Sequence, residues 1–192
     1  MVKFFLRHGR RHKPQGLRVA GSLAPGRPAG LWEGMAILDP LSLRSALAPG
    51  RRILGLDLGD KTIGLALSDS TLTVATPQET IRRTRFTADA EALERFIAAR
   101  EVGALVIGLP INMNGSEGPR CQSVRQFAAN LLIRGDIPIA FWDERLSTAA
   151  VERFMVSEAD ISRKRRAELV DKLAAAYILQ SALEAMRHAP PD

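Results

Sequence analysis

Three acidic residues in separate parts of the chain have the types and positions of a carboxylate centre. Asp57 interrupts the apolar run "ILGLDLGDK", Glu144 ends the run "IPIAFWDE", and Asp171 lies in the helical pattern "RAELVDKLAAAYILQ". Carboxylates that converge repel one another unless a cation lies between them, and all-oxygen ligation suits Mg²⁺ or Mn²⁺. Two such ions can hold the attacking water and the leaving oxygen of a phosphodiester. The pattern therefore indicates metal-dependent hydrolysis of such an ester.

The acids that end strands also have ordinary structural explanations. Asp57 can cap the turn that follows it or pair with Lys61. Glu144 can pair with Arg145 at a solvated strand end, which contributes little energy. Asp143, beside Glu144, is a further candidate metal ligand, because strand twist decides which of the two points inward.

Asp171 differs from these two because it belongs to a helix. It shares a helical face with Ala174, Ala175 and Ile178, so the acid emerges from an apolar stripe of small residues. A carboxylate on a packing face needs a partner, since burial of an unpaired charge is costly. The alanines would also let this helix lie close to the sheet.

Hydrophobic patterns predict the elements that position these acids. We expect strands at 52–58, 62–69, within 72–81, 104–110 and 137–144, and helices at 87–103, 119–134, from Ser147 and at 164–187. The first three strands form an antiparallel meander, and the last two are continuous apolar runs that run parallel to the first. This order predicts an α/β fold, a mixed five-stranded sheet with helices on both faces. Ligands of such sheets gather at the carboxyl ends of the parallel strands.

Strand alternation gives the first hairpin two different faces. Leu54, Leu56 and Leu58 share one face with the larger residues of the partner strand, whereas Asp57 shares the other with small residues, namely Gly55, Gly64, Ala66 and Ser68. The small residues leave space beside the carboxylate for a metal and a phosphate.

Basic and amide side chains near the same edge are candidates for substrate binding. The loop "INMNGSEGPR" follows a buried strand and offers Asn112 and Asn114, with Arg120 at the start of the next helix. Arg145 and Lys164, the latter in the cluster "RKRR", can hold a nucleic-acid backbone. Lys61, in the turn after Asp57, completes the set.

The N-terminal segment has a different composition from the rest. Residues 1–52 hold ten basic and two acidic residues, against 27 and 21 in the whole chain, so the net charge of +6 belongs to this segment. Its Gly, Pro and Arg content predicts a disordered basic extension over 1–50 before a domain at 51–188. An upstream start codon, with Met35 as the alternative start, or an organelle transit peptide would explain the same composition.

The single cysteine excludes a disulfide framework and zinc sites built on several cysteines. Cys121 therefore favours a reducing, intracellular setting, and we expect a soluble, cytoplasmic protein because no apolar run approaches the ~20 residues that span a membrane. All three histidines fall near the ends of the chain, so no histidine competes with the acids as a catalytic base.

Four motifs together resemble the YqgF/RuvX family, which is counted in the RNase H-like superfamily. They are "GLDLGDKTIGLALSD", "VIGLPINMNGSEGPR", "DERLST" and "VDKLAAAYILQ", in that order, and the likeness covers residues 51–187. The resemblance implies an RNase H-like sheet and a nuclease that matures the 5′ end of pre-16S rRNA in ribosome biogenesis. It places the catalytic acids at Asp57, Glu144 and Asp171. The family usually has Lys directly before its helix Asp, where this chain reads "ELVD".

Other functions fit parts of the same pattern. The family also has an older proposed role as a Holliday-junction resolvase, with branched DNA as its substrate. A non-catalytic factor that binds RNA or the small ribosomal subunit would keep the same fold. The first hairpin also resembles the phosphate-binding hairpin of the actin, Hsp70 and sugar-kinase ATPases, but those proteins close two such domains around ATP. The sequence leaves open whether the protein is a monomer or a homodimer.

Overall fold

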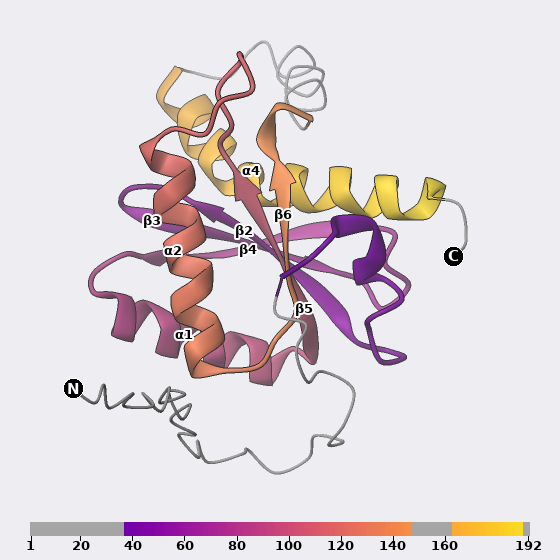
Figure 1. Ribbon diagram of the computed structural model, residues 1–192. Helices are drawn as coiled ribbons and strands as arrows, with labels where there is room; N and C mark the ends of the chain where they lie inside the picture. The colour runs from indigo at the N-terminus through magenta and orange to yellow at the C-terminus, as the bar shows by residue number, and fades with distance from the viewer. Residues whose placement is uncertain (1–36, 147–162, 190–192) are drawn as a thin grey trace, which may run out of the picture. The chain divides into compact units, whose positions relative to one another are not determined.

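The computed structural model describes residues 37–146 and 163–189, and its side chains are described over 37–146 and 173–189 (Figure 1). The first 36 residues and the helix predicted from Ser147 lie outside the described residues. Within the described part, no helix is long and apolar enough to cross a membrane.

A mixed six-stranded sheet forms the centre of the fold, in the order β1-β6-β5-β2-β3-β4. Its strands are β1 (Ile37–Leu38), β2 (Arg52–Leu58), β3 (Thr62–Ser68), β4 (Ala75–Arg82), β5 (Val102–Leu109) and β6 (Ile139–Asp143). The hairpin strands β2, β3 and β4 pair antiparallel, while β5 pairs parallel to both β2 and β6. The predicted meander with two parallel strands is therefore confirmed.

One strand was not predicted. The edge strand β1 has only two residues, and it pairs parallel to β6 through Ile37–Ile139 and Leu38–Ala140. Two residues are too few to leave an alternating pattern in the sequence. The short 3-10 helix η1 (Pro40–Leu43) follows it, with Leu43 fully buried. The predicted disordered extension up to residue 50 therefore does not hold for residues 37–50, which contain β1 and η1 and place Leu38, Leu43 and Leu47 against the core.

Helices cover both faces of the sheet. The helices α1 (Phe86–Ala99) and α2 (Pro119–Arg134) cover one face, and α4 (Arg163–His188) lies across the other (Figure 1). The bounds of α2 are those predicted, and α1 ends four residues earlier than the predicted Gly103. A single 3-10 turn, η2 (Glu144–Leu146), follows β6.

The two hairpin faces enter different hydrophobic cores, as the alternation predicts. Leu54, Leu56 and Leu58 pack with residues of α1 and α2, whereas Ile53 and Ala66 pack with α4. Small residues bring α4 close to the sheet. A Cβ atom built on Gly55 would lie 2.7 Å from Leu179 Cβ and 3.0 Å from the Ala175 carbonyl oxygen. Only glycine fits at this crossing, which fixes the position of α4 beside β2.

Candidate active site

A cavity of about 500 Å³ opens at the carboxyl ends of the parallel strands β2, β5 and β6. Asp57 lies near the end of β2, Pro110 directly follows β5, and Glu144 directly follows β6. The lining consists of Asp57, Pro110, Ile111, Asn112, Gly118, Pro119, Arg120, Glu144, Arg145, Ala174, Tyr177 and Ile178. The cavity therefore lies where the strand topology places a ligand.

Asp57 and Glu144 line the same cavity, and the charge of Asp57 influences Glu144. The pKa of the Glu144 carboxyl is raised to about 7, mainly because burial disfavours its charged form and next because Asp57 adds negative charge. Arg120 lowers this pKa in part, and Asp143 raises it slightly further. Two acids that resist simultaneous ionisation form a site that a cation would stabilise.

Gly108 makes the space that the Glu144 carboxylate occupies. A Cβ atom built on Gly108 would lie 2.7 Å from Glu144 Oε1 and 2.6 Å from Ile178 Cδ1. Any larger residue at position 108 would displace the Glu144 carboxylate or α4. We did not predict Gly108 from the sequence, although a glycine inside the buried run "LVIGLP" is a signal of close approach.

The structure distinguishes the two neighbouring acids at the end of β6. The Asp143 carboxylate accepts hydrogen bonds from Arg145, whose Nη2 lies 2.6 Å from Oδ2 and whose Nε lies 3.0 Å from both oxygens. The Arg145 backbone N–H also donates to Oδ1 at 3.0 Å. These bonds hold the pKa of Asp143 below its usual range. Asp143 therefore pairs with Arg145, whereas Glu144 lines the cavity.

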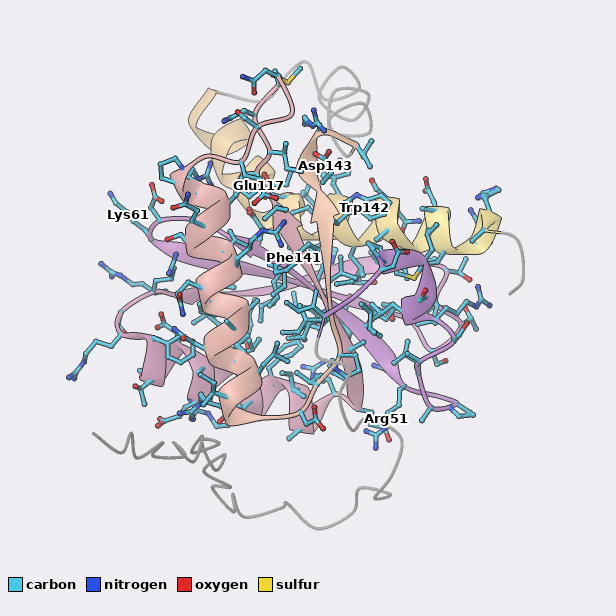
Figure 2. The ribbon with its side chains drawn as sticks, in the orientation of Figure 1. Arg51, Lys61, Glu117, Phe141, Trp142 and Asp143 are labelled. Carbon is cyan, nitrogen blue, oxygen red and sulfur yellow. The ribbon has the colours of Figure 1, made fainter. Side chains whose placement is uncertain are left out.

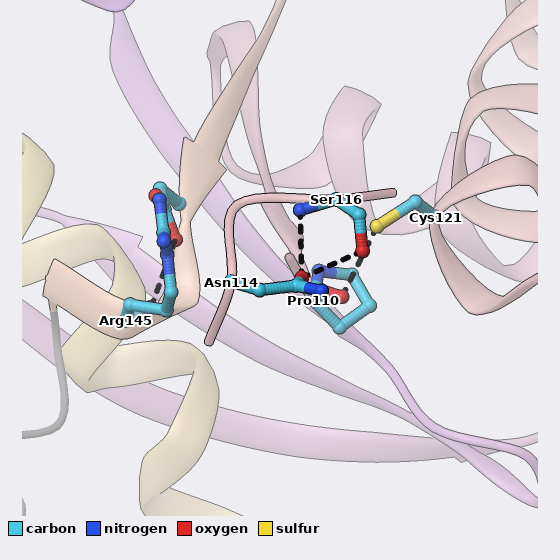
Figure 3. Close-up of polar contacts among 6 residues, drawn as sticks. Pro110, Asn114, Ser116, Cys121 and Arg145 are labelled. Atoms are coloured by element: carbon cyan, nitrogen blue, oxygen red, sulfur yellow. Dashed lines mark hydrogen bonds and ion pairs between the residues drawn. The ribbon is translucent and has the colours of Figure 1, made fainter. Parts of the chain in front are cut away.

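The loop 110–118 at the rim is held by its own hydrogen bonds (Figure 3). The Asn112 backbone N–H donates to the Ser116 carbonyl at 3.0 Å, and Gly115 N–H donates to the Asn112 carbonyl at 2.8 Å. The Ser116 hydroxyl donates to Asn114 Oδ1 at 2.7 Å. Gly115 has a φ of +84°, which an L side chain rarely adopts. Asn112 lines the cavity and Asn114 braces the turn behind it.

Two helices contribute the other polar groups of the cavity. Helix α2 begins after Gly118 with Pro119 in its first turn, and Arg120 follows at the cavity wall. From the opposite face of the sheet, α4 contributes Tyr177, which the sequence-based set of site residues missed. A tyrosine in an apolar helical stripe resembles any other core residue, so the sequence carries no separate signal for it.

The remaining predicted residues lie elsewhere. Lys61 is exposed in the turn between β2 and β3, far from Asp143 (Figure 2), and it does not line the cavity. The Asp171 and Lys164 side chains lie outside the described residues, although both positions belong to α4. Asp171 precedes Ala174 by one helical turn and Ile178 by two, and both of these line the cavity. Among the described side chains, no three His, Cys, Asp or Glu residues form a metal-binding group.

Comparison with known proteins adds three findings. The family model described as "RuvX: Holliday junction resolvase" matches residues 51–185. A protein of Paramagnetospirillum magneticum named "Putative pre-16S rRNA nuclease" is 63% identical over 150 residues, which are 78% of this chain and 96% of that protein. A protein of Rhodospirillum rubrum with the same name is 56% identical over 158 residues, 82% of this chain and 98% of that one.

A solved structure of Thermus thermophilus RuvC with a Holliday-junction substrate also matches. The match has a TM-score of 0.48 and 13% identity, and it covers 74% of this chain and 99% of that one.

Proposed function

The chain belongs to the RuvX family, and we propose that it is a metal-dependent nuclease that trims the 5′ end of precursor 16S rRNA by phosphodiester hydrolysis. This proposal rests mainly on the presence of Asp57 and a half-buried Glu144 in one cavity at the strand ends. The name shared by the relatives from two bacteria supports the choice of RNA substrate.

The donor set of the cavity fits a hard divalent cation. Asp57 and Glu144 offer only carboxylate oxygens, and their mutual repulsion would be relieved by Mg²⁺ or Mn²⁺. Asp171 is the proposed third ligand, because its place in α4 is one turn before the cavity residue Ala174. When bound, such an ion supplies Lewis-acid activation of the ester and of water near neutral pH.

The other cavity residues would bind and orient the substrate. Arg120 and the backbone N–H groups of the first turn of α2 offer donors to a phosphate. Asn112 presents an amide from a loop whose shape is fixed by its internal hydrogen bonds. Tyr177 provides an aromatic ring on which a base can stack. Glu144 is half-buried in this cavity, which strengthens its interaction with charge.

The description of the family favours a second candidate substrate, a four-way DNA junction. The experiment that separates the two uses purified full-length protein with Mg²⁺, Mn²⁺ or EDTA. One substrate is a precursor rRNA that carries the 5′ end of 16S rRNA, and the other is a four-way junction. We expect metal-dependent cleavage of the RNA. Preferred cleavage of the junction would indicate that the protein resolves DNA junctions instead. If the protein cleaves neither substrate, the proposed nuclease function is wrong.

The proposed substrate also implies a partner and a location. 16S rRNA is a component of the small ribosomal subunit, so we propose that subunit as the partner and the cytoplasm as the site of action. Sedimentation of a cell extract through a sucrose gradient checks this partner. The protein should sediment with immature small subunits, and its presence in the light fractions alone would contradict the partner.

A further inference from the structure

A second, smaller hollow adjoins the active-site cavity. It has a volume of about 200 Å³, and we name it the Arg83 groove. Its lining consists of Leu58, Asp60, Arg83, Pro119, Arg120, Ser123, Val124 and Phe127. Pro119 and Arg120 also line the active-site cavity, so the two hollows meet at the first turn of α2. A chain that leaves the cavity past Arg120 therefore enters this groove.

Arg83 lines the groove, and its side chain is held in place. Its Nη1 donates to the Gly59 carbonyl oxygen at 2.7 Å, and its guanidinium carbon lies 5.9 Å from the centre of the Phe127 ring. Its backbone N–H donates to the Lys61 carbonyl at 2.9 Å. A guanidinium has five N–H donors, so the bond to Gly59 leaves capacity to bind an anion. Because the side chain is already oriented, little rotamer entropy is lost on binding.

The charges of the groove suit a phosphate. Arg83 and Arg120 are its cations, and Asp60, in an exposed turn, is the acid of the lining. Ser123 adds a hydroxyl from the second turn of α2. The flanking positions Lys61, Arg82 and Arg85 are exposed and basic. Arginine and serine side chains are typical contacts of nucleic-acid phosphates.

We propose that the Arg83 groove binds a backbone phosphate of the nucleic-acid strand adjacent to the phosphate in the active-site cavity. This inference rests on the proposed nuclease function and names a subsite of it. Arg83 is then a positioning residue that fixes the register of the strand, with Arg120 between the two phosphates. The contact is to the backbone, so it carries no preference for base sequence.

The test measures binding of a fluorescein-labelled single-stranded RNA oligonucleotide by anisotropy, with full-length protein in EDTA over a range of salt concentrations. For Arg83→Gln we expect roughly threefold to tenfold weaker binding, and a salt slope smaller by about one. Arg83→Lys keeps the charge and should recover much of the affinity. Arg187→Gln is the matched control, since this exposed arginine lies at the far end of α4.

A second variant tests the groove while Arg83 stays in place, so that the result does not depend on the folding of Arg83→Gln. Ser123→Glu adds a negative charge to the groove without removing the bond between Arg83 and Gly59, and it should weaken binding at least as much. If both Arg83→Gln and Ser123→Glu bind RNA with the affinity and salt slope of the wild type, the proposed subsite is wrong. Metal-dependent cleavage by the wild type would still support the nuclease function in that case. A wild-type protein that neither binds nor cleaves RNA would overturn the proposed function and this inference with it.

Discussion

Gly108 lies against the side chain of Glu144, a residue of the active-site cavity, so a Cβ atom built on the glycine would lie 2.7 Å from the carboxylate oxygen Oε1. The position of the acid is thus fixed by the absence of a side chain on the neighbouring strand. The lack of a side chain at Gly108 also leaves room for Ile178 of α4. One glycine therefore determines the positions of both the Glu144 carboxylate and this part of α4.

Gly108→Ala should therefore impair catalysis. We expect cleavage to fall about 10- to 100-fold, because a displacement of the order of 1 Å of a positioned group has effects of this size. Single-turnover cleavage is the measurement. Gly135→Ala is the control, since a Cβ atom there meets nothing within 4 Å. Full activity in Gly108→Ala would show that catalysis does not depend on the placement of the Glu144 carboxylate by Gly108.

Stability should depend on pH through Glu144. Its pKa is about 7 in the folded protein and 4.5 in an unfolded chain, so between these values the folded state binds the additional proton. The free energy of unfolding must then fall as pH rises through this window, by the order of 1 kcal/mol for a partly exposed group. Urea unfolding in EDTA at pH 5 and pH 8 measures it.

Glu144→Gln supplies the control for this pH dependence, because the amide does not titrate. Its unfolding free energy should change less between the two pH values than that of the wild type. The addition of Mg²⁺ should stabilise the wild type more at pH 8 than at pH 5, since protons compete with the ion for the carboxylates. Equal pH dependence of both proteins would contradict the raised pKa.

Asp143 and Glu144 should differ in their importance for catalysis. Asp143→Asn removes the ion pair with Arg145, which lies at the surface, so we expect only a small loss of stability. Cleavage should remain well above that of Glu144→Gln. If Asp143→Asn is as inactive as Glu144→Gln, then Asp143 is a metal ligand after all.

Gly55→Ala tests the close contact between β2 and α4. The added carbon would meet Leu179 Cβ at 2.7 Å and backbone oxygen at 3.0 Å, neither of which moves easily. Forced overpacking of this kind costs about 1 to 3 kcal/mol. Denaturant unfolding measures the loss, again with Gly135→Ala as the reference. An unchanged midpoint would mean that α4 adjusts without cost.

The long elements could be predicted because their patterns follow from burial. The strands β2, β3, β5 and β6 are five to eight residues long and mostly apolar, and α2 has a helical pattern with Pro119 at its start. Strand β1 could not be predicted, because its two residues carry no period and its pairing with β6 is a long-range contact. The same long-range packing buries Leu43 in a segment whose composition suggested disorder.

The candidate site was predictable where an acid stands out against an apolar background. Asp57 and Glu144 are such positions, and the structure brings both into one cavity. Asp143 and Glu144 could not be distinguished in advance, because the turn of η2 and the bonds to Arg145 decide their directions. Tyr177 and Gly108 were missed since each acts through tertiary packing, and Asp171 stays a prediction.

The carboxylates of Asp57 and Glu144 are the proposed basis of metal-dependent cleavage. The most direct measurement is single-turnover cleavage of the precursor rRNA in Mg²⁺ by the wild type, Asp57→Asn and Glu144→Gln, with thermal unfolding to confirm that each variant is folded. Both variants should lose at least about 100-fold in rate, and EDTA should abolish cleavage by the wild type. Cleavage by folded Asp57→Asn at the wild-type rate would show that this carboxylate is not needed for catalysis.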